Sequence, residues 1–541
     1  MQQLSTRRGF LELIGAGAAM TLLAACQAAP GATAAQPTTA STAPVPAALT
    51  TVSTPTAVPV ASPKQGGTLR AMQAGDLSSV DGHYYTPGAG LSAWIVFDTL
   101  TEYDDNLVPQ PALAESWDQS SDGKQISLTL RKGVTFHSGR EVTSDDLIYN
   151  LNRILDFKLT AGIITGFVPP NTQWAARDKY TVTMTTEKPW INVFDFLQVL
   201  NILDKDSPDG PRGKTTAVGT GAFTFVEWVQ GDHVTYAKTK NYWRTGTPLL
   251  DQIVLTIAKD QQAMTVQLEA GQVDFIVGPT IQDFVRLTGD ASKYQGLELP
   301  NPAAFAMMQP NSTLAPMDNK LVRQALNWAI DRQRMADAVQ LGRVKIQDLP
   351  WPPASPASEP QKNNLIAFDL DKAKSLLQQA GVGNFDLDLL YSAVSTTAAQ
   401  QAQIYQSDLA RIGVNGIIRT LQPAALLDAW HTQTYGLYFA ADPWANLEPL
   451  TQFTSGSTTN YRGNNGGYRS DAYTQLVEAA AGEVDAVKRK QIYSQLNDFL
   501  LDEAFVYALW PNITRAVARP NLMDLGHRRN EMWTFSHAWF A

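Results

Sequence analysis

A single thiol is the first residue in this sequence that could undergo chemistry. Cys26 is the only cysteine in the 541 residues, so the chain cannot form an internal disulfide. It directly follows Leu23, Ala24 and Ala25. This order resembles the bacterial lipobox, in which the cysteine is acylated and becomes the mature N-terminus. The sequence therefore predicts a lipid on Cys26, and the alternatives are a buried structural cysteine or an ordinary signal peptide that happens to contain a cysteine.

The residues before Cys26 have the pattern of an export signal. Arg7 and Arg8 form a twin-arginine pair, and an apolar stretch runs through residues 13–25. This stretch is about half the ~20 residues that a membrane-spanning helix needs, and its length is typical of a signal peptide. A twin-arginine pair addresses folded cargo to export. We therefore expect a twin-arginine lipoprotein signal at residues 1–26 and a protein anchored outside the cytoplasm, on the cell surface or in a periplasm.

A charge-free segment separates this signal from the rest of the chain. Residues 27–63 consist mainly of Ala, Thr, Pro and Ser and contain no charged residue. Such a composition buries too little apolar surface to offset chain entropy, so we expect a disordered linker. The signal contains two arginines and one glutamate, and its removal changes the net charge from -9 to -10. An acidic protein of this kind is a poor partner for nucleic acid.

The residues that could support catalysis or hold a metal form no familiar pattern. The sequence contains no Gly-x-Ser-x-Gly elbow, no His-Glu-x-x-His motif and no phosphate-binding Gly-x4-Gly-Lys-[Ser/Thr] loop. The histidines form no His-x3-His pair, since they stand at His83, His137, His233, His431, His527 and His537. We therefore expect no enzyme activity, no cofactor and no metal site.

The first elements after the linker have the patterns of a small α+β unit. Apolar residues alternate with polar ones over residues 126–130, which predicts a half-buried strand. Thr143 and Asp146 have the spacing of a capping box at the start of a helix. A strand, a turn and a capped helix in this order indicate an α+β unit.

The second half of the sequence alternates helix and strand patterns. Asp318 and Asp369 are expected to cap two helices, and Gly381 is expected to end the second. Strand patterns follow at residues 385–389 and 414–420, with a helix between them. Such alternation favours a parallel or mixed sheet, and sheets of this type bind ligands beyond the carboxyl ends of their strands.

Five sequence blocks follow one another between Gly66 and about Tyr507. They are PALAESW at 111–117 with DGK at 122–124, LRKGVTFHSG at 130–139 with TSDDL at 143–147, VGTGAF at 218–223 with NYW at 241–243, LEAGQVD at 268–274, and VRQALNWAIDR at 322–332. Together they resemble family 5 of the bacterial extracellular solute-binding proteins, which includes oligopeptide-, dipeptide- and nickel-binding proteins. One block alone would be a weak signal, whereas five in the family's order are specific.

The resemblance implies an α/β protein with a two-lobed fold of the periplasmic-binding-protein type (type II), a hinge and an extra α+β domain. By similarity, the first lobe comprises residues 64–107, 211–305 and 516–541. The extra domain comprises residues 108–210, and the second lobe residues 306–515. The resemblance also implies the monomeric receptor of an ABC importer, which closes on a peptide or peptide-like solute and presents it to the membrane permease.

Asp442 is the first candidate for a ligand contact. A peptide can be held by its backbone as an added strand, but its buried ammonium group needs a carboxylate. Asp442 follows the apolar run 435–441, where a strand is expected to end. In the oligopeptide-binding relatives an aspartate closing a similar strand pairs with the peptide's amino group, so the resemblance implies this role for Asp442. A turn or helix cap before Pro443 is the alternative.

The resemblance implies further ligand contacts near Asp442. Phe439 stands where the family has an aromatic residue that lines the site, and Ala440 belongs to the strand whose backbone binds the ligand. Trp444 is a third candidate. The chain departs from the family after Asp442, because Pro443 and Trp444 follow directly and the run 446–449 comes next, where the better-known peptide binders have acidic or amide residues closer by. The sequence assigns no cationic residue to a ligand carboxylate: Arg462 is a downstream loop residue for which a solvated loop charge is the favoured interpretation and a carboxylate partner the alternative.

Two other ligand classes stay open at this point. Nickel binders share the implied fold, so nickel or a metallophore is one alternative. An oligosaccharide is the other, because sugars stack on indoles and the chain has 13 tryptophans. Four of these, Trp117, Trp228, Trp243 and Trp328, fall in the family blocks or on apolar faces and are expected in the core.

Overall fold

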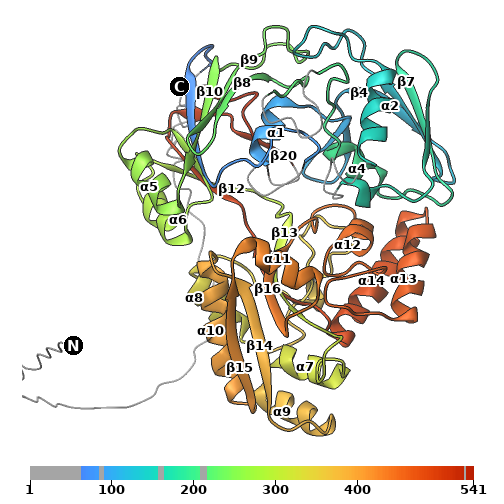
Figure 1. Cartoon of the computed structure of the whole chain (residues 1–541), viewed down its shortest axis with the longest axis vertical. Coiled ribbons are helices and arrows are strands. Elements are labelled where there is room, and N and C mark those ends of the chain that lie inside the picture. Colours follow the sequence, from blue (N-terminus) through green and yellow to red (C-terminus); the bar gives the residue numbers. More distant parts are fainter. Residues whose placement is uncertain (1–61, 85–89, 156–163, 208–215, 529–531) are drawn as a thin grey trace, which may run out of the picture. The chain divides into compact units, whose positions relative to one another are not determined.

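A computed structural model describes residues 62–84, 90–155, 164–207, 216–528 and 532–541 (Figure 1). Arg7, Arg8, Cys26 and nearly all of the predicted linker lie outside these ranges. The chain divides into two units, residues 1–60 and residues 61–541. Among the described residues, no helix is both long enough and apolar enough to cross a membrane.

The largest sheet has seven strands, in the order β12-β18-β11-β1-β10-β9-β8. The strands are β1 (Thr68–Ala74), β8 (Phe223–Val229), β9 (His233–Lys238), β10 (Gln252–Ala258), β11 (Phe275–Val277), β12 (Gln295–Glu298) and β18 (Arg515–Ala518). β1 pairs in parallel with β10 and β11, and the other pairs are antiparallel. We call this sheet and its helices α1 (Gly90–Val96), α5 (Gln261–Glu269) and α6 (Ile281–Thr288) the seven-stranded lobe.

Three short strand pairs complete this part of the chain. They are β2 (Thr101–Tyr103) with β3 (Pro109–Pro111), β19 (Leu522–Met523) with β22 (Trp539–Phe540), and β20 (Gly526–Arg528) with β21 (Met532–Thr534). The last pair contacts α1, so the C-terminal segment packs against the seven-stranded lobe.

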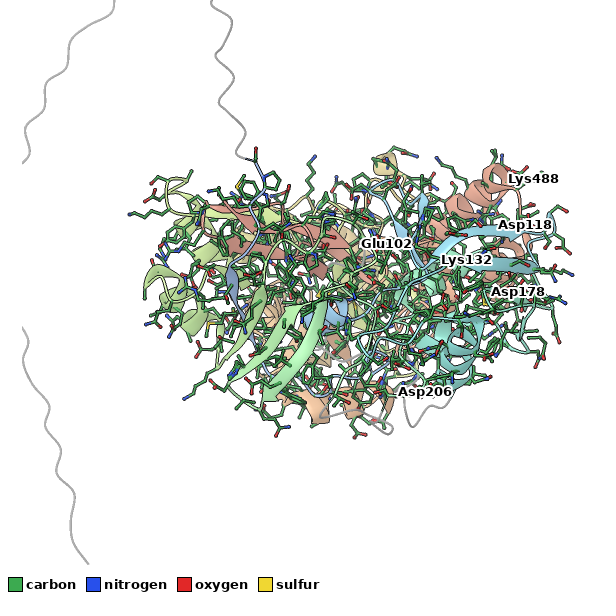
Figure 2. The ribbon with its side chains drawn as sticks, turned by 90° about the horizontal axis from the view of Figure 1, so that it is seen from above. Glu102, Asp118, Lys132, Asp178, Asp206 and Lys488 are labelled. Carbon is green, nitrogen blue, oxygen red and sulfur yellow. The ribbon has the colours of Figure 1, made fainter. Side chains whose placement is uncertain are left out.

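A four-stranded antiparallel sheet, in the order β4-β5-β7-β6, forms the extra domain. Its elements are β4 (Ala114–Gln119), β5 (Gln125–Leu130), α2 (Ser144–Arg153), η1 (Ile164–Phe167), β6 (Gln173–Ala176), β7 (Thr181–Thr185) and α4 (Val193–Val199). The predicted strand at residues 126–130 is confirmed as β5. The exposed Asp118 and Asp178 lie at the periphery of this domain (Figure 2), whereas its helices and strands enclose a separate apolar core.

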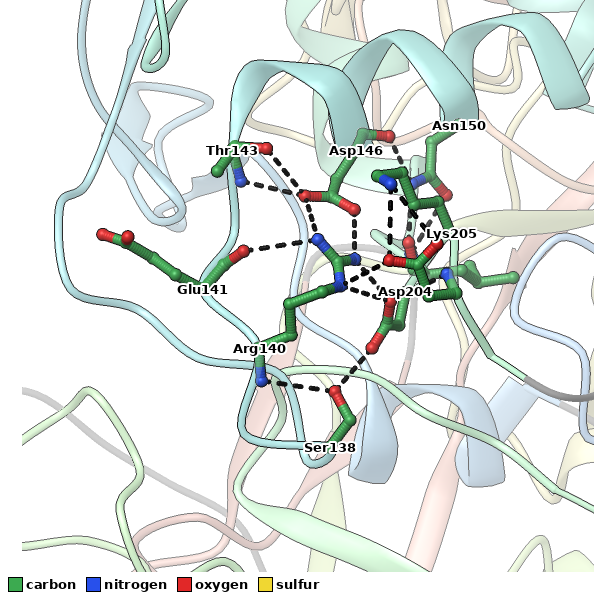
Figure 3. Close-up of polar contacts among 10 residues, drawn as sticks. Ser138, Arg140, Glu141, Thr143, Asp146, Asn150, Asp204 and Lys205 are labelled. Carbon is green, nitrogen blue, oxygen red and sulfur yellow. Dashed lines mark hydrogen bonds and ion pairs between the residues drawn. The ribbon is translucent and has the colours of Figure 1, made fainter.

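A partly buried cluster of charges fixes the start of α2 (Figure 3). Asp146 accepts hydrogen bonds from the backbone N and Oγ1 of Thr143, both at 3.0 Å, so the predicted capping box is confirmed. The Arg140 guanidinium donates to Asp146 at 2.9 Å and to Asp204 at 3.0 Å. Ser138 donates to the other oxygen of Asp204 at 2.6 Å. This cluster therefore ties α2 to the segment that leaves the extra domain.

The third sheet has five strands, in the order β15-β14-β16-β13-β17. They are β13 (Ala304–Pro310), β14 (Phe385–Ser392), β15 (Val414–Leu421), β16 (Leu437–Asp442) and β17 (Tyr507–Asn512). One face packs against α7 (Lys320–Trp328), α8 (Arg332–Gln340), α9 (Leu370–Gln379) and α10 (Thr396–Ala410). The other packs against α11 (Pro423–His431), α12 (Pro449–Ser455), α13 (Asp471–Gly482) and α14 (Ala486–Glu503), and a short turn η2 (Pro360–Lys362) lies between α8 and α9. We call this part the five-stranded lobe.

The helix ends test three sequence predictions in this lobe. The cap of α9 is confirmed, because the Asp369 carboxylate accepts from Lys372 N at 2.8 Å. Gly381 follows the end of that helix with a φ of +68°, which a residue with a side chain rarely adopts. The cap predicted at Asp318 is wrong: α7 starts at Lys320, and Asn319 accepts from Leu321 N at 2.9 Å.

Two chain segments cross between the lobes. β12 leads through residues 299–303 into β13, and β17 leads through residues 513–514 back into β18. The crossings are joined by a hydrogen bond from Leu299 N to Thr514 O at 3.1 Å. Two crossings side by side have the form of a hinge, in which a few terminal residues of each element absorb a rotation. The domain boundaries given above stay predictions.

Candidate functional site

The topology places one end of each sheet's parallel strands at the hinge. β13 starts next to the crossing and is antiparallel to β16, so β16 ends there, as do β14 and β15, which run parallel to it. In the seven-stranded lobe β12 enters the crossing, and β11, β1 and β10 run in the same direction. The carboxyl ends of parallel strands from both lobes therefore lie at one edge. Sheets of this type bind ligands at such an edge.

Asp442 is the last residue of β16 and lies at that edge. It pairs with Phe305 of β13, and its side chain is completely buried. Its carboxylate accepts from Gln452 Nε2 at 2.8 Å, Ser457 Oγ at 2.9 Å and Thr458 N at 3.3 Å, and also from Thr458 Oγ1. Burial raises the pKa of Asp442, while these donors act in the opposite direction. Within the described part of the chain, no cation pairs with this carboxylate.

The two carboxylate oxygens of Asp442 accept different numbers of hydrogen bonds. Three of the four donors reach Oδ2, and only Ser457 reaches Oδ1. A carboxylate has about four acceptor positions, two on each oxygen. Oδ1 therefore keeps the capacity to accept one further donor.

The other predicted contact residues take different positions. Ala440 lies on the same face of the strand as Asp442, but Phe439 lies on the opposite face, where it packs against Tyr405 with ring centroids 6.4 Å apart. Phe439 is 2% exposed and belongs to the core. Trp444 has a φ of +76° and contacts Phe167 of η1, with centroids 5.2 Å apart. The ligand roles of these three residues and of Asp442 stay predictions.

Arg462 lies at the rim of a cavity beside α12. The cavity has a volume of about 230 Å³ and is lined by Phe167 and Trp190 of the extra domain and by Leu450 and Tyr461 of the five-stranded lobe, among others. The Arg462 guanidinium stacks on the Tyr461 ring at 5.1 Å from its centroid. It therefore borders the junction between the extra domain and the five-stranded lobe, on the side of α12 that carries Leu450.

Two further carboxylates near Asp442, Asp195 and the partly buried Glu448, were not indicated by the sequence. Asp195 of α4 is fully buried, and burial raises its pKa to about 7. Glu448 accepts from Tyr493 OH and lies 3.5 Å from Arg489 Nε, and burial raises its pKa as well. No local pattern could have indicated this arrangement, because Asp195 and Glu448 are 253 positions apart in the sequence. Glu448 N donates a hydrogen bond of 3.2 Å to the Asp195 carboxylate.

No three His, Cys, Asp or Glu side chains gather as metal ligands within the described ranges. The buried His83 illustrates how a histidine is used instead. Its Nε2 lies 2.8 Å from the carbonyl of Asn201, so this nitrogen donates, and its Nδ1 accepts from Arg153 at 2.9 Å. Burial, and then Arg153, lower the pKa of His83 far below its usual value.

Comparison with known proteins identifies the family. Residues 108–464 match bacterial extracellular solute-binding proteins, family 5, middle region. The chain belongs to this family. The sequence resemblance and the two-lobed α/β fold are therefore confirmed, and the chain is a solute-binding protein of the ABC importer class rather than an enzyme.

Relatives of this family member bind different solutes. Heme-binding protein A of Haemophilus influenzae is 28% identical over 450 residues, which cover 76% of this chain and 80% of that protein. Di/tripeptide-binding protein 1 of Pseudomonas aeruginosa is 27% identical over 469 residues, or 79% and 86% of the two chains. The periplasmic binding protein DppA of Helicobacter pylori, solved with the peptide STSA, superposes with a TM-score of 0.76 at 22% identity, over 88% of this chain and 98% of that one. This last likeness shows the fold alone.

Proposed function

We propose that this solute-binding protein captures a peptide or peptide-like solute between its two lobes and delivers it to the permease of an ABC importer. One observation carries the choice of ligand class. Asp442 is a buried carboxylate without a cationic partner in the described residues, and it ends β16 at the hinge-side edge of the sheet. A ligand ammonium would neutralise this charge and use the free capacity of Oδ1.

The same observation favours one of the two named relatives over the other as an indication of the ligand class. A heme presents carboxylates to its receptor, and these favour cationic residues. A di- or tripeptide presents an ammonium group, which favours a carboxylate such as Asp442. The di/tripeptide-binding relative is therefore the better guide, and it matches this chain nearly as well as the heme-binding relative does.

The ligand class can be tested with pairs of peptides that differ only at the amino terminus. We expect the purified protein to bind free di- and tripeptides and to bind their N-acetylated forms at least about tenfold more weakly, since a charged hydrogen bond contributes about 1.5–3 kcal/mol. Isothermal titration calorimetry measures both, and mass spectrometry of co-purifying molecules identifies the natural ligand. Equal affinity for free and acetylated peptides would contradict the proposal.

We further propose that the protein is held at the membrane by a lipid on Cys26 after export through the twin-arginine route. Cys26→Ala is expected to abolish incorporation of a labelled fatty acid and to release the protein from the membrane fraction, because the thiol that would carry the lipid is removed. The control is Arg7→Lys with Arg8→Lys, which should instead leave an unprocessed precursor in the cytoplasm. A Cys26→Ala protein that still incorporates the labelled fatty acid would exclude lipid anchoring at Cys26.

A further inference from the structure

A segment of the five-stranded lobe is buried in the extra domain. Leu447 is 0% exposed and belongs to the apolar core of the extra domain, together with residues of β5, α2 and α4. Trp444 packs edge-on against Phe167 of the same domain. The loop between β16 and α12 is thus inserted into a neighbouring domain. Any movement that separates the two must withdraw Leu447 from that core.

Asp195 binds the start of α12 from the extra domain. Its carboxylate accepts from Glu448 N at 3.2 Å and from Thr451 Oγ1, while Tyr103 OH donates to it at 2.9 Å. Asn192 Nδ2, one turn earlier, donates to the same Thr451 oxygen at 2.7 Å. All of these groups are buried or partly buried, so each contact replaces water at the junction.

The same short helix connects this junction to Asp442. Thr451, which Asp195 holds, is followed directly by Gln452, whose amide donates to Asp442 Oδ2 at 2.8 Å. Ser457 and Thr458, the other donors to Asp442, stand just beyond the end of α12. A shift of α12 therefore changes the donors that hold the Asp442 carboxylate.

We propose that Asp195 is a positioning residue for ligand capture: by holding α12 it fixes the donors of Asp442 and fastens the extra domain onto the five-stranded lobe in the closed state. This inference rests on the proposed role of Asp442 in binding the ligand. It adds a group outside the ligand site, on a different domain, that sets how readily the protein closes.

The charges around Asp195 determine how this contact responds to pH. Glu448 faces it from the start of α12, Arg489 and Tyr493 lie behind Glu448, and Tyr103 faces it from β2. When the lobes separate, water reaches Asp195 and its pKa returns to its ordinary value near 4. With the junction formed, as in this structure, the pKa is about 7, so the protein with a formed junction binds the proton more tightly. Closure is therefore favoured below pH 7, and this contribution is lost as the pH rises through 7.

The contacts of Asp195 survive protonation. Two of its partners, Thr451 and Tyr103, are hydroxyls, which can accept as well as donate. Glu448 N still finds a carbonyl oxygen on the neutral acid. Asparagine has the same shape and is also neutral, so Asp195→Asn imitates the protonated state, whereas Asp195→Ala removes the contact.

The test measures the distance across the junction in the absence of ligand. Spin labels at the exposed positions Glu115→Cys and Val394→Cys, in a Cys26→Ser background, report the open and closed populations of the protein. We expect the closed-to-open ratio to fall about tenfold from pH 6 to pH 8.5. Asp195→Asn should stay closed at both pH values, and Asp195→Ala should be open at both. Asp204→Asn, a buried carboxylate away from the junction, should follow the unsubstituted protein.

Two results would overturn the inference. The first is that Asp195→Asn shows the same pH dependence as the unsubstituted protein. The second is that Asp195→Ala has the same closed population as the unsubstituted protein. Peptide affinity at pH 8.5 supplies a second readout. Asp195→Ala should bind peptide more weakly, and Asp195→Asn should keep the affinity that Asp195→Ala loses. The distance measurement needs no ligand, so its outcome is independent of the proposed function. If the spin-label distances change as expected but no peptide binds, the proposed function is contradicted. If free peptides bind but the distances do not respond to pH or to substitution of Asp195, only the role of Asp195 is contradicted.

Discussion

Arg153→Met is expected to lower the free energy of unfolding by about 3–5 kcal/mol, the cost of leaving a buried charge without its partner. The Arg153 guanidinium donates to both oxygens of Asp81 and, at 2.9 Å, to His83 Nδ1. The side chains of Arg153 and Asp81 are 7% and 2% exposed. Methionine fills a similar volume but leaves the Asp81 carboxylate in the interior. Denaturant unfolding followed by circular dichroism measures the loss.

The same substitution should have a defined dependence on pH. In the unsubstituted protein, Arg153 and burial keep His83 neutral, since both lower its pKa. Without Arg153, the negative charge of Asp81 favours a proton on His83, which then pairs with Asp81. The loss of stability should therefore be largest near pH 8 and smaller near pH 5.

A second substitution separates the lost pair from lost packing. Asp81→Asn combined with Arg153→Met removes both charges and should cost less than Arg153→Met alone, because no unpaired charge remains. The exposed Arg177→Met serves as the control and should change stability by less than about 0.5 kcal/mol. A double variant as unstable as the single one would show that packing, and not charge, dominates at this site.

The pair of Arg153 and Asp81 also shows where sequence reasoning stops. Thr143 and Asp146, the partners of the capping box, are three positions apart, so the local pattern contains both. Arg153 and Asp81 are 72 positions apart, and Asp195 and Thr451 are 256 apart. Neither pair leaves a periodic or local signal. Such contacts are set by how domains pack, and they include the groups that tie the extra domain to each lobe.

Phe439 illustrates a different limit. The sequence indicated the strand and its end at Asp442 correctly, because the apolar run stops there. It could not indicate which side of the strand faces which neighbour, since both faces of this sheet are covered by helices. Tyr438 and Phe439 are both buried, at 7% and 2% exposure, so polar and apolar residues do not alternate. The wrong cap at Asp318 has a local cause: two adjacent polar residues can each cap, and Asn319 has the position that reaches Leu321 N.

Asp442→Asn is expected to weaken binding of free-amine peptides by about 2–5 kcal/mol, the range for removing one partner of a buried charge pair. The amide keeps the size of the carboxylate but cannot neutralise an ammonium group. N-acetylated peptides should bind the variant and the unsubstituted protein alike. Isothermal titration calorimetry with matched peptide pairs measures both effects.

Stability should change in the opposite direction, and this separates a binding role from a structural one. Burial raises the pKa of Asp442 above its unfolded value, so the contribution of this group to stability is present at low pH and lost as the pH rises. Burial therefore favours the neutral form at this position, and Asp442→Asn, which is always neutral, should be at least as stable as the unsubstituted protein at pH 8. Asp146→Asn is the matched control: it breaks a buried pair with Arg140 and should destabilise the fold without changing peptide affinity. If Asp442→Asn instead destabilises the fold and leaves affinity unchanged, the carboxylate serves only to hold Gln452, Ser457 and Thr458 in place.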